Sequence, residues 1–333
     1  MNAARAGRPP GKRTRRGTAA LIASLIVLSL VSLATGNAGF AFGDLWADAS
    51  GLGDLLLISR IPRLVAVIVA GGGMCVAGMI MQTIARNRFV APSTAGTVAW
   101  CKLGILAGTL LFVEAPLMAR MAAAFLSSLA GTFIFVRILS RIRVRNIITV
   151  PLAGMVLGAV VESLNTFLAT RYDLVQNMES WLQGSFALVV RGRYELLYAG
   201  IPVAAVTYLY ANKFTIAGMG GDFARGLGLN HRQLTTLGLS LAALTTSVVT
   251  ISVGAIPFID LVIPNLAAIF RGDNLRSNLP DTALLGANFV LFCDLVSRLV
   301  MRPYEIPVGV TAGIIGGGVF LWLLARRNRL ADS

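Results

Sequence analysis

Four charged residues interrupt apolar stretches of this chain and are the first candidates for chemistry. Lys102, Glu162, Asp260 and Asp294 stand in or beside long apolar runs. Ionisable groups at such positions are costly to insert into a membrane, so they are functional candidates by default. The three acids are scattered, and we expect Asp260 and Asp294 near segment ends, where water reaches them. Lys102 has two interpretations: its stem snorkels to an interface, or its ammonium faces a transport path and attracts an anionic substrate.

The sequence lacks the motifs of common catalytic and metal sites. Its one Gly-Lys pair lies in the basic N-terminal tail without the rest of a phosphate-binding loop, and neither a nucleophile elbow nor a His-Glu-x-x-His motif is present. A single histidine, His231, cannot build a metal site alone. The three cysteines have no metal-ligand spacing and are expected to be small packing residues: Cys75, Cys101 and Cys293. We therefore expect no catalysis and no bound metal.

Three arginines stand at the ends of apolar runs. Arg60 and Arg63 flank Pro62 where the second run begins, and Arg298 closes the ninth. The planar guanidinium group suits carboxylate pairing because it donates two parallel hydrogen bonds. From residue types alone, these arginines either anchor helix ends at the membrane interface or recognise an acidic partner.

A short polar island, Gly221–Asn230, separates two apolar runs in the second half of the chain. The spacing of Phe223, Ala224, Leu227 and Leu229 predicts a short amphipathic helix that ends at a glycine. We expect this helix to lie at the membrane surface rather than to cross the membrane.

The elements that carry these residues are predicted to be membrane helices. The chain has 333 residues, of which 56% are hydrophobic and 13% charged, and its mean hydropathy is +0.75. Soluble domains carry roughly 25% charged residues. The apolar residues come in blocks of about 20, the length that crosses the hydrocarbon core of a bilayer. The sequence therefore predicts an all-α polytopic membrane protein, because these runs lack the alternation of a β-barrel.

We expect about ten crossings in one transmembrane domain, 18–326, between a basic tail, 1–17, and a second tail, 327–333. The eighth is short and contains Pro257 and Pro264, so we expect it to pack inside the protein or line a cavity. The segment 171–193 should lie along one face of the membrane. The predicted crossings are 18–36, 62–84, 95–112, 116–138, 147–170, 194–211, 234–254, 257–270, 280–300 and 306–325.

The distribution of basic residues indicates the orientation. An even number of crossings puts both ends on one side, and most Lys and Arg residues lie on that side if it is the cytoplasm. The net charge of +14 is therefore a topology signal rather than a sign of nucleic-acid binding. The island 221–230 falls on the cytoplasmic side, and the three arginines fall on the opposite face. Closely spaced glycines within the crossings predict tight helix packing.

The order of several motifs resembles FecCD-type permeases, the membrane subunits of type II ATP-binding-cassette (ABC) importers for iron–siderophores, haem and vitamin B12. Residues 87–96 and 271–274 are similar to the branch for catecholate and mixed-ligand siderophores, including petrobactin-like ones. Two positions depart from the family pattern: Asn265 stands where histidine is more usual, and Asp222 replaces glutamate. The matching segments are Arg60–Arg63, Gln82, Asn87–Pro92, Gly221–Gly228, Gly254–Ile259, Val262–Asn265, Leu279–Pro280 and Glu305–Gly309.

The resemblance implies a dimer of identical or different permeases around one translocation path. Arg60, Arg63 and Arg298 would receive acidic residues of a periplasmic or lipoprotein substrate-binding protein. The coupling segment, about 220–231, would contact a separate ATPase that binds ATP and Mg, through Gly221, Asp222, Phe223, Ala224, Arg225, Leu227 and Gly228. For the translocation path we assign Gln82, Lys102, Asn165, Pro264 and Asn265.

We therefore predict a non-catalytic permease of the bacterial cytoplasmic membrane that imports a ferric siderophore. It would contact membrane lipid and bind neither nucleic acid nor a cofactor of its own. The alternative is a secondary transporter driven by protons or sodium, with Glu162, Asp260 and Asp294 as ion sites. A membrane-embedded enzyme is disfavoured because a nucleophile or metal cluster is missing.

Overall fold

The computed structural model describes residues 12–35, 56–111, 117–141, 149–187, 189, 195–271, 274–301 and 304–331. Within these ranges the regular secondary structure is helical, apart from one isolated β-bridge between Gln183 and Ala255. The tails 1–11 and 332–333 and part of the predicted outer segment, including Arg191 and Arg193, lie outside the described residues.

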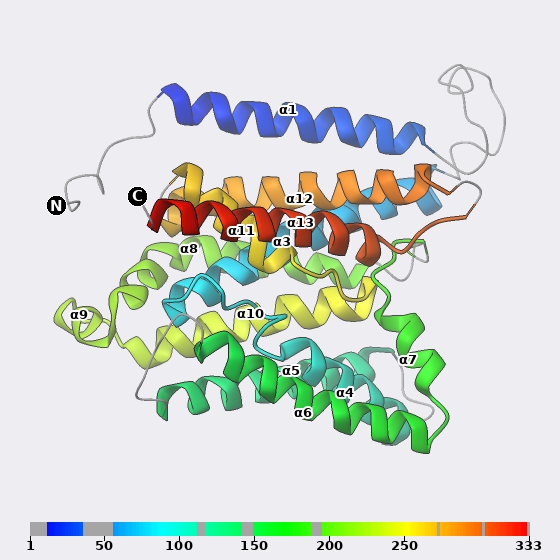
Figure 1. Cartoon of the computed structure of the whole chain (residues 1–333), viewed down its shortest axis with the longest axis horizontal. Helices are drawn as coiled ribbons and strands as arrows, with labels where there is room; N and C mark the ends of the chain where they lie inside the picture. Colours follow the sequence, from blue (N-terminus) through cyan, green and yellow to red (C-terminus); the bar gives the residue numbers. More distant parts are fainter. Residues whose placement is uncertain are drawn as a thin grey trace.

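Ten long helices match the ten predicted crossings one for one within the described residues. They run side by side, and Figure 1 shows their axes roughly parallel to the long axis of the molecule. The all-α membrane fold predicted from the apolar blocks is confirmed. The ten are α1 (Lys12–Ala34), α3 (Ile61–Ala85), α4 (Thr97–Leu111), α5 (Leu117–Arg141), α6 (Thr149–Arg171), α8 (Gly200–Met219), α10 (His231–Val253), α11 (Ile259–Arg271), α12 (Leu275–Leu299) and α13 (Val308–Ala331).

Six of these helices are long and apolar enough to cross a membrane by length and composition. They differ in how much of the apolar stretch is buried inside the protein: 67% for α3 and for α10, but only 6% for α1. Helices α3 and α10 therefore form the centre of the bundle, and α1 packs at its edge against α12 (Figure 1).

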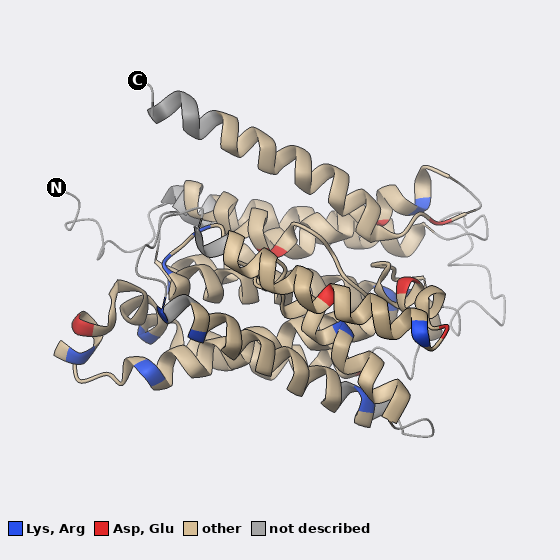
Figure 2. Cartoon of the chain, turned by 60° about the horizontal axis from the view of Figure 1, so that its bottom comes forward, with Lys and Arg blue, Asp and Glu red and all other residues tan. Residues whose placement is uncertain are grey.

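Short helices mark the two ends of the bundle. The helix α9 (Gly221–Gly226) lies at the end where α1 begins and α13 ends, and α7 (Val175–Leu182) lies at the other end, together with η3 (Leu56–Arg60). A further short helix, η4 (Glu195–Ala199), precedes α8. Following the charge-based orientation, we call the α9 end cytoplasmic and the α7 end outer. Most charged residues in Figure 2 lie toward one end or the other.

Glycines set the closest helix contacts, as the sequence predicted. A Cβ on Gly71 of α3 would lie 2.6 Å from the carbonyl oxygen of Gly286 on α12. A Cβ on Gly78 would lie 1.8 Å from the carbonyl oxygen of Asp260 on α11. Because these contacts are with backbone atoms, a side chain at either position would force the helices apart.

The eighth predicted crossing, α11, is short and packs inside the protein, as expected from its prolines. It begins after Pro257 and contains Pro264 in its interior. Between them, Phe258 has a φ of 65°, a left-handed conformation that bulky residues rarely adopt. Its ring packs 6.2 Å from that of Phe320 on α13, which holds this turn in place.

Candidate functional site

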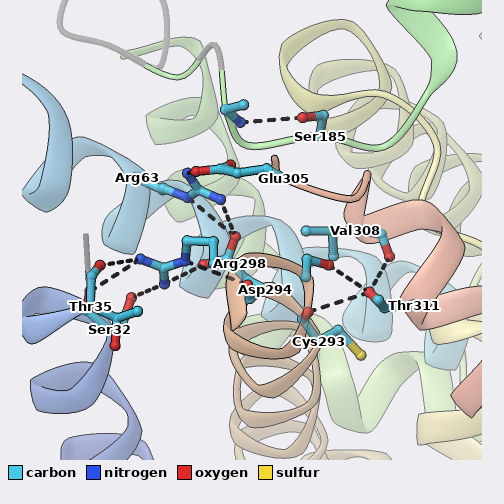
Figure 3. A network of polar contacts seen from close by, with 12 residues as sticks. Ser32, Thr35, Arg63, Ser185, Cys293, Asp294, Arg298, Glu305, Val308 and Thr311 are labelled. Atoms are coloured by element: carbon cyan, nitrogen blue, oxygen red, sulfur yellow. Dashed lines mark hydrogen bonds and ion pairs between the residues drawn. The ribbon is translucent and has the colours of Figure 1, made fainter. Parts of the chain in front are cut away.

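Two arginines and two acids meet at the outer end of the bundle, and Figure 3 shows this network at close range. Both oxygens of the Asp294 carboxylate are used: Oδ1 lies 2.8 Å from Arg63 Nη2, and Oδ2 lies 2.6 Å from Arg298 Nη2. Arg63 also pairs with Glu305, at 2.9 Å between Nη1 and Oε2. The two positive and two negative charges balance, which is the condition for keeping such groups in a largely buried place.

The same network holds the end of α1. Arg298 donates to the carbonyl oxygens of Ser32 (3.2 Å) and Thr35 (2.9 Å), and Arg60 donates to that of Leu33 (2.6 Å). The last carbonyl groups of a helix have no partner within it and carry the negative end of its dipole, so arginine is well suited to cap them. This contact fastens the exposed helix α1 to α3 and α12.

The predicted docking arginines are therefore only partly at the surface. Arg60 is half-buried, Arg63 points into the network, and Arg298 is only 6% exposed. Their assignment to a binding protein stays a prediction, while the anchoring of helix ends is visible in the contacts. The sequence analysis did not identify Asp294 as the shared counter-ion of Arg63 and Arg298. The spacing of Asp294 and Arg298, four residues apart on one helix, was the available signal.

Backbone hydrogen bonds also connect neighbouring segments at the outer end. After α7, Ser185 N donates to Val253 O at the end of α10, and Gly309 N donates to Gly184 O, both at 2.8 Å. A Cβ on Gly184 would lie 2.3 Å from the Ala255 carbonyl oxygen, so this crossing requires a glycine. The segment that follows α7 is thereby held between α10 and α13, although Gly184 was not among the predicted site residues.

Lys102 lies in an ion-pair cluster rather than alone. Its Nζ is 2.5 Å from Glu162 Oε1 on α6 and 3.8 Å from Glu179 Oε1 on α7. Lys102 is 7% exposed, and Asn165 beside it is fully buried and donates to Ala99 O and to Glu162. The structure thus brings Lys102 and Asn165 together and pairs the lysine with two carboxylates. The place of Lys102 on a transport path stays a prediction.

The expectation that water reaches Asp260 and Asp294 is wrong, since both residues have 0% exposure. The Asp260 carboxylate accepts hydrogen bonds from Ser93 N (2.8 Å) and Ser93 Oγ (2.9 Å). The loop between α3 and α4 folds back over the first turn of α11, where the helix dipole favours an acid. Asp294 is covered by its two arginines.

Gln82, Pro264 and Asn265 lie together, away from Lys102 and Asn165. Pro264 has no backbone N–H, and in the same turn the side chains of Gln82 (3.2 Å) and Asn265 (2.9 Å) both donate to Leu261 O. Asn265 also donates to Arg88 O at 2.7 Å. The carbonyl that loses its helical partner at Pro264 is that of Asp260, so the two side-chain donors serve the next carbonyl of the same turn. These residues join α11 to α3 and to the loop that follows it.

The helix α9 projects at the cytoplasmic end (Figure 1). It follows α8 after a single residue, Gly220, and it ends at Gly226, before Gly228 with a φ of 72°. Ala224 is buried, whereas Phe223 and Leu227 are 51% and 55% exposed. Asp222 and Arg225 form an ion pair of 2.7 Å on its surface. A short helix with exposed apolar side chains, predicted for the island, is confirmed.

The described residues contain no group of three or more His, Cys, Asp or Glu side chains that could hold a metal ion. All three cysteines are buried and unpaired. The arrangement as a whole is a bundle of membrane helices with internal ion pairs and an exposed helix at one end.

The family of this helical bundle follows from a comparison with protein-family models. The model of the FecCD transport family matches residues 24–326. The chain belongs to the FecCD transport family. It is a multi-pass protein of the cytoplasmic membrane, as the resemblance implied.

Individual members of the FecCD family are similar over almost the whole chain. The petrobactin import system permease protein YclN of Bacillus subtilis is 49% identical over 307 residues, which cover 92% of this chain and 97% of that protein. The petrobactin import system permease protein FatD of Bacillus anthracis is 38% identical, over 92% of this chain and 90% of its own length.

The fold of this FecCD-family chain also matches a solved structure. A metal-chelate type ABC transporter in an inward-facing conformation superposes with a TM-score of 0.78 at 21% identity, over 93% of this chain and 99% of the other. The family motifs 254–259 and 305–309, far apart in sequence, meet at the outer end through Gly184.

Proposed function

We propose that this chain is the non-catalytic membrane subunit of an ABC importer that carries a ferric siderophore into the cytoplasm. One observation carries the proposal: an exposed helix, α9, projects from the cytoplasmic end of a chain whose sequence has no nucleotide-binding loop. The FecCD relatives named for petrobactin import support the substrate class. ATP and Mg would be bound by a partner ATPase.

The connections of α9 suit it to transmit movement. One residue separates it from α8, and the Asn230 side chain caps the first turn of α10 by accepting from Gln233 N at 3.2 Å. A push on the exposed Phe223 and Leu227 would therefore reach two membrane helices without passing through a flexible linker. Gly226 and Gly228 end the helix rather than make it flexible.

The internal charges argue against the ion-coupled alternative. Asp260 accepts two hydrogen bonds from Ser93, Asp294 lies between two arginines, and Glu162 pairs with Lys102. Each acid of the alternative hypothesis thus has a structural partner. An ion site of a secondary transporter requires a carboxylate that exchanges its proton or cation during transport.

We assign the outer end as the docking face for a substrate-binding protein, with the half-buried Arg60 and Arg63 nearer the surface than Arg298. Exposed ion pairs contribute about 0–1 kcal/mol each, so acidic residues of the partner would set its register more than its affinity. A second permease subunit would complete the translocation path. We place Lys102 and Asn165 near its outer part and Gln82, Pro264 and Asn265 near its cytoplasmic part.

Reconstitution tests this function. The permease, its ATPase and its binding protein are placed in proteoliposomes, and uptake of a ferric siderophore is followed. We expect uptake to require ATP and Mg on the ATPase side and to continue when a protonophore or a sodium ionophore removes the ion gradients. Uptake that follows an imposed ion gradient without ATP would refute the proposal.

A further inference from the structure

A cavity of about 310 Å³ opens at the cytoplasmic ends of α3, α8, α11 and α12. It lies beside the α8–α9 junction, because Gly218 and Met219 form part of its wall. The polar residues that line it include Gln82, Thr83, Arg86, Asn87, Arg88 and Asn278. None of the assignments above explains why this cavity carries two arginines.

The charged side chains in the cavity wall are positive. Arg86 and Arg88 line it, and no carboxylate stands among the described residues of its wall. Among the described residues, none accepts a hydrogen bond from the Arg86 guanidinium, whereas Arg63 and Arg298 both pair with Asp294. The Arg86 Nη1 atom lies 3.3 Å from the position of a Cβ on Gly220, so the guanidinium rests against the start of the coupling segment.

The backbone of Arg86 is a second, independent observation. Arg86 caps the C-terminus of α3 in the left-handed conformation, with a φ of 54°. Glycine is the usual residue at such a cap because a Cβ is strained there. The chain thus places a cationic side chain at the cavity wall although the backbone of Arg86 is strained. Strained backbone of this kind is often found at ligand-binding positions.

Further donors surround the same space. Asn87 and Asn278 are 8% and 0% exposed, and both line the cavity. Leu275, the first residue of α12, contributes the beginning of a helix, whose dipole favours an anion. The Asn274 side chain caps this helix by accepting from Ser277 N at 3.2 Å. Two guanidinium groups with amide donors form a set suited to a tetrahedral oxyanion.

We propose that this cavity binds a phosphate group, presented by an anionic lipid of the inner leaflet or by a soluble phosphate. The site lies at the cytoplasmic ends of four membrane helices, the level at which lipid phosphates are found. A phosphate bound there contacts Gly218 and Met219, and through them the segment that leads into α9.

The test uses the purified full-length permease in detergent. Native mass spectrometry measures how much phosphatidylglycerol or phosphatidylcholine stays bound at equal lipid concentration. In parallel, the thermal unfolding midpoint is measured in sodium phosphate and in sodium chloride of equal ionic strength. The test variant is the double change Arg86→Gln and Arg88→Gln. The matched control is Arg232→Gln, an exposed arginine of the same end that does not line the cavity.

For the wild type and the control we expect selective retention of phosphatidylglycerol, or stabilisation by inorganic phosphate. The first outcome identifies a lipid and the second a soluble phosphate. The double variant should weaken that binding about tenfold, because it removes charge-assisted hydrogen bonds. Replacing both arginines with lysine should restore part of it and shows that the loss is not misfolding. Equal binding by the wild type and the double glutamine variant, or no preference for phosphate in the wild type, would overturn the proposal.

Discussion

At the scale of single residues, ion pairs join helices that are far apart in the sequence. Asp294 joins Arg63 of α3 to Arg298 of α12, and Arg298 in turn caps α1. The sequence predicted that Arg63 and Arg298 lie on the outer face, but it did not predict that both pair with Asp294. Arg63 and Asp294 are 231 positions apart, and only the packing of α3 against α12 brings them together.

Replacing Asp294 with asparagine should destabilise the protein strongly. Two guanidinium groups would lose their shared carboxylate, and breaking a buried ion pair costs about 3–5 kcal/mol. Thermal unfolding of the solubilised permease measures the loss. The control Glu305→Gln removes a more exposed partner of Arg63 and should cost only about 0–1 kcal/mol. Equal effects of the two changes would contradict a central role for Asp294.

Replacing Asp260 with asparagine separates the two transport hypotheses. The amide oxygen still accepts a hydrogen bond from Ser93, so we expect insertion and ATP-driven uptake to remain within a few-fold of the wild type. A proton-coupled transporter with Asp260 as its ion site would lose transport entirely. Uptake by the Asp260→Asn variant across a range of external pH therefore decides whether this carboxylate moves protons.

At the scale of helices, glycine contacts determine how closely the central elements approach. Closely spaced glycines indicated tight packing, but the sequence did not show which backbone each glycine meets. Gly78 approaches the backbone of Asp260, whereas a Cβ on Gly318 would meet nothing within 4 Å. The two positions look alike in the sequence and differ only in their three-dimensional neighbours.

These two glycines form a matched pair of tests. Gly78→Ala should separate α3 from α11 and cost about 1–3 kcal/mol or more, because the clash is with backbone. Gly318→Ala should be neutral or stabilising by up to about 1 kcal/mol, since alanine favours a helix. Unfolding midpoints and membrane expression levels measure both. If Gly78→Ala is as stable as the wild type, the close approach of α3 and α11 is wrong.

The helix α9 can be tested in the same way. Leu227→Asp places a charge where an ATPase would bind, and the side chain is already exposed, so we expect normal insertion and loss of ATP-driven uptake. Arg232→Gln, just outside the segment, should transport normally. Uptake rates and ATPase activity are compared in the reconstituted complex. Wild-type uptake by Leu227→Asp would count against α9 as the coupling element.

At the scale of the whole molecule, the sequence was sufficient for the architecture and insufficient for the internal contacts. Apolar blocks of about 20 residues encode membrane crossings directly, so each predicted crossing matched one helix. Helix α9 was also predictable because a polar island within apolar runs is a local signal. The pairing of Lys102 with Glu162 and the burial of Asp260 depend on contacts between distant segments, which no local pattern encodes.

Uptake by whole cells measures the import of a ferric siderophore with every subunit in its native membrane. A strain that lacks this gene is given a panel of siderophores loaded with radiolabelled iron, including petrobactin and other catecholates. We predict that the strain loses uptake of at least one of them, that the wild-type chain restores it, and that Leu227→Asp does not. Unchanged uptake of every siderophore in the deletion strain, with its related importers also removed, would contradict the account.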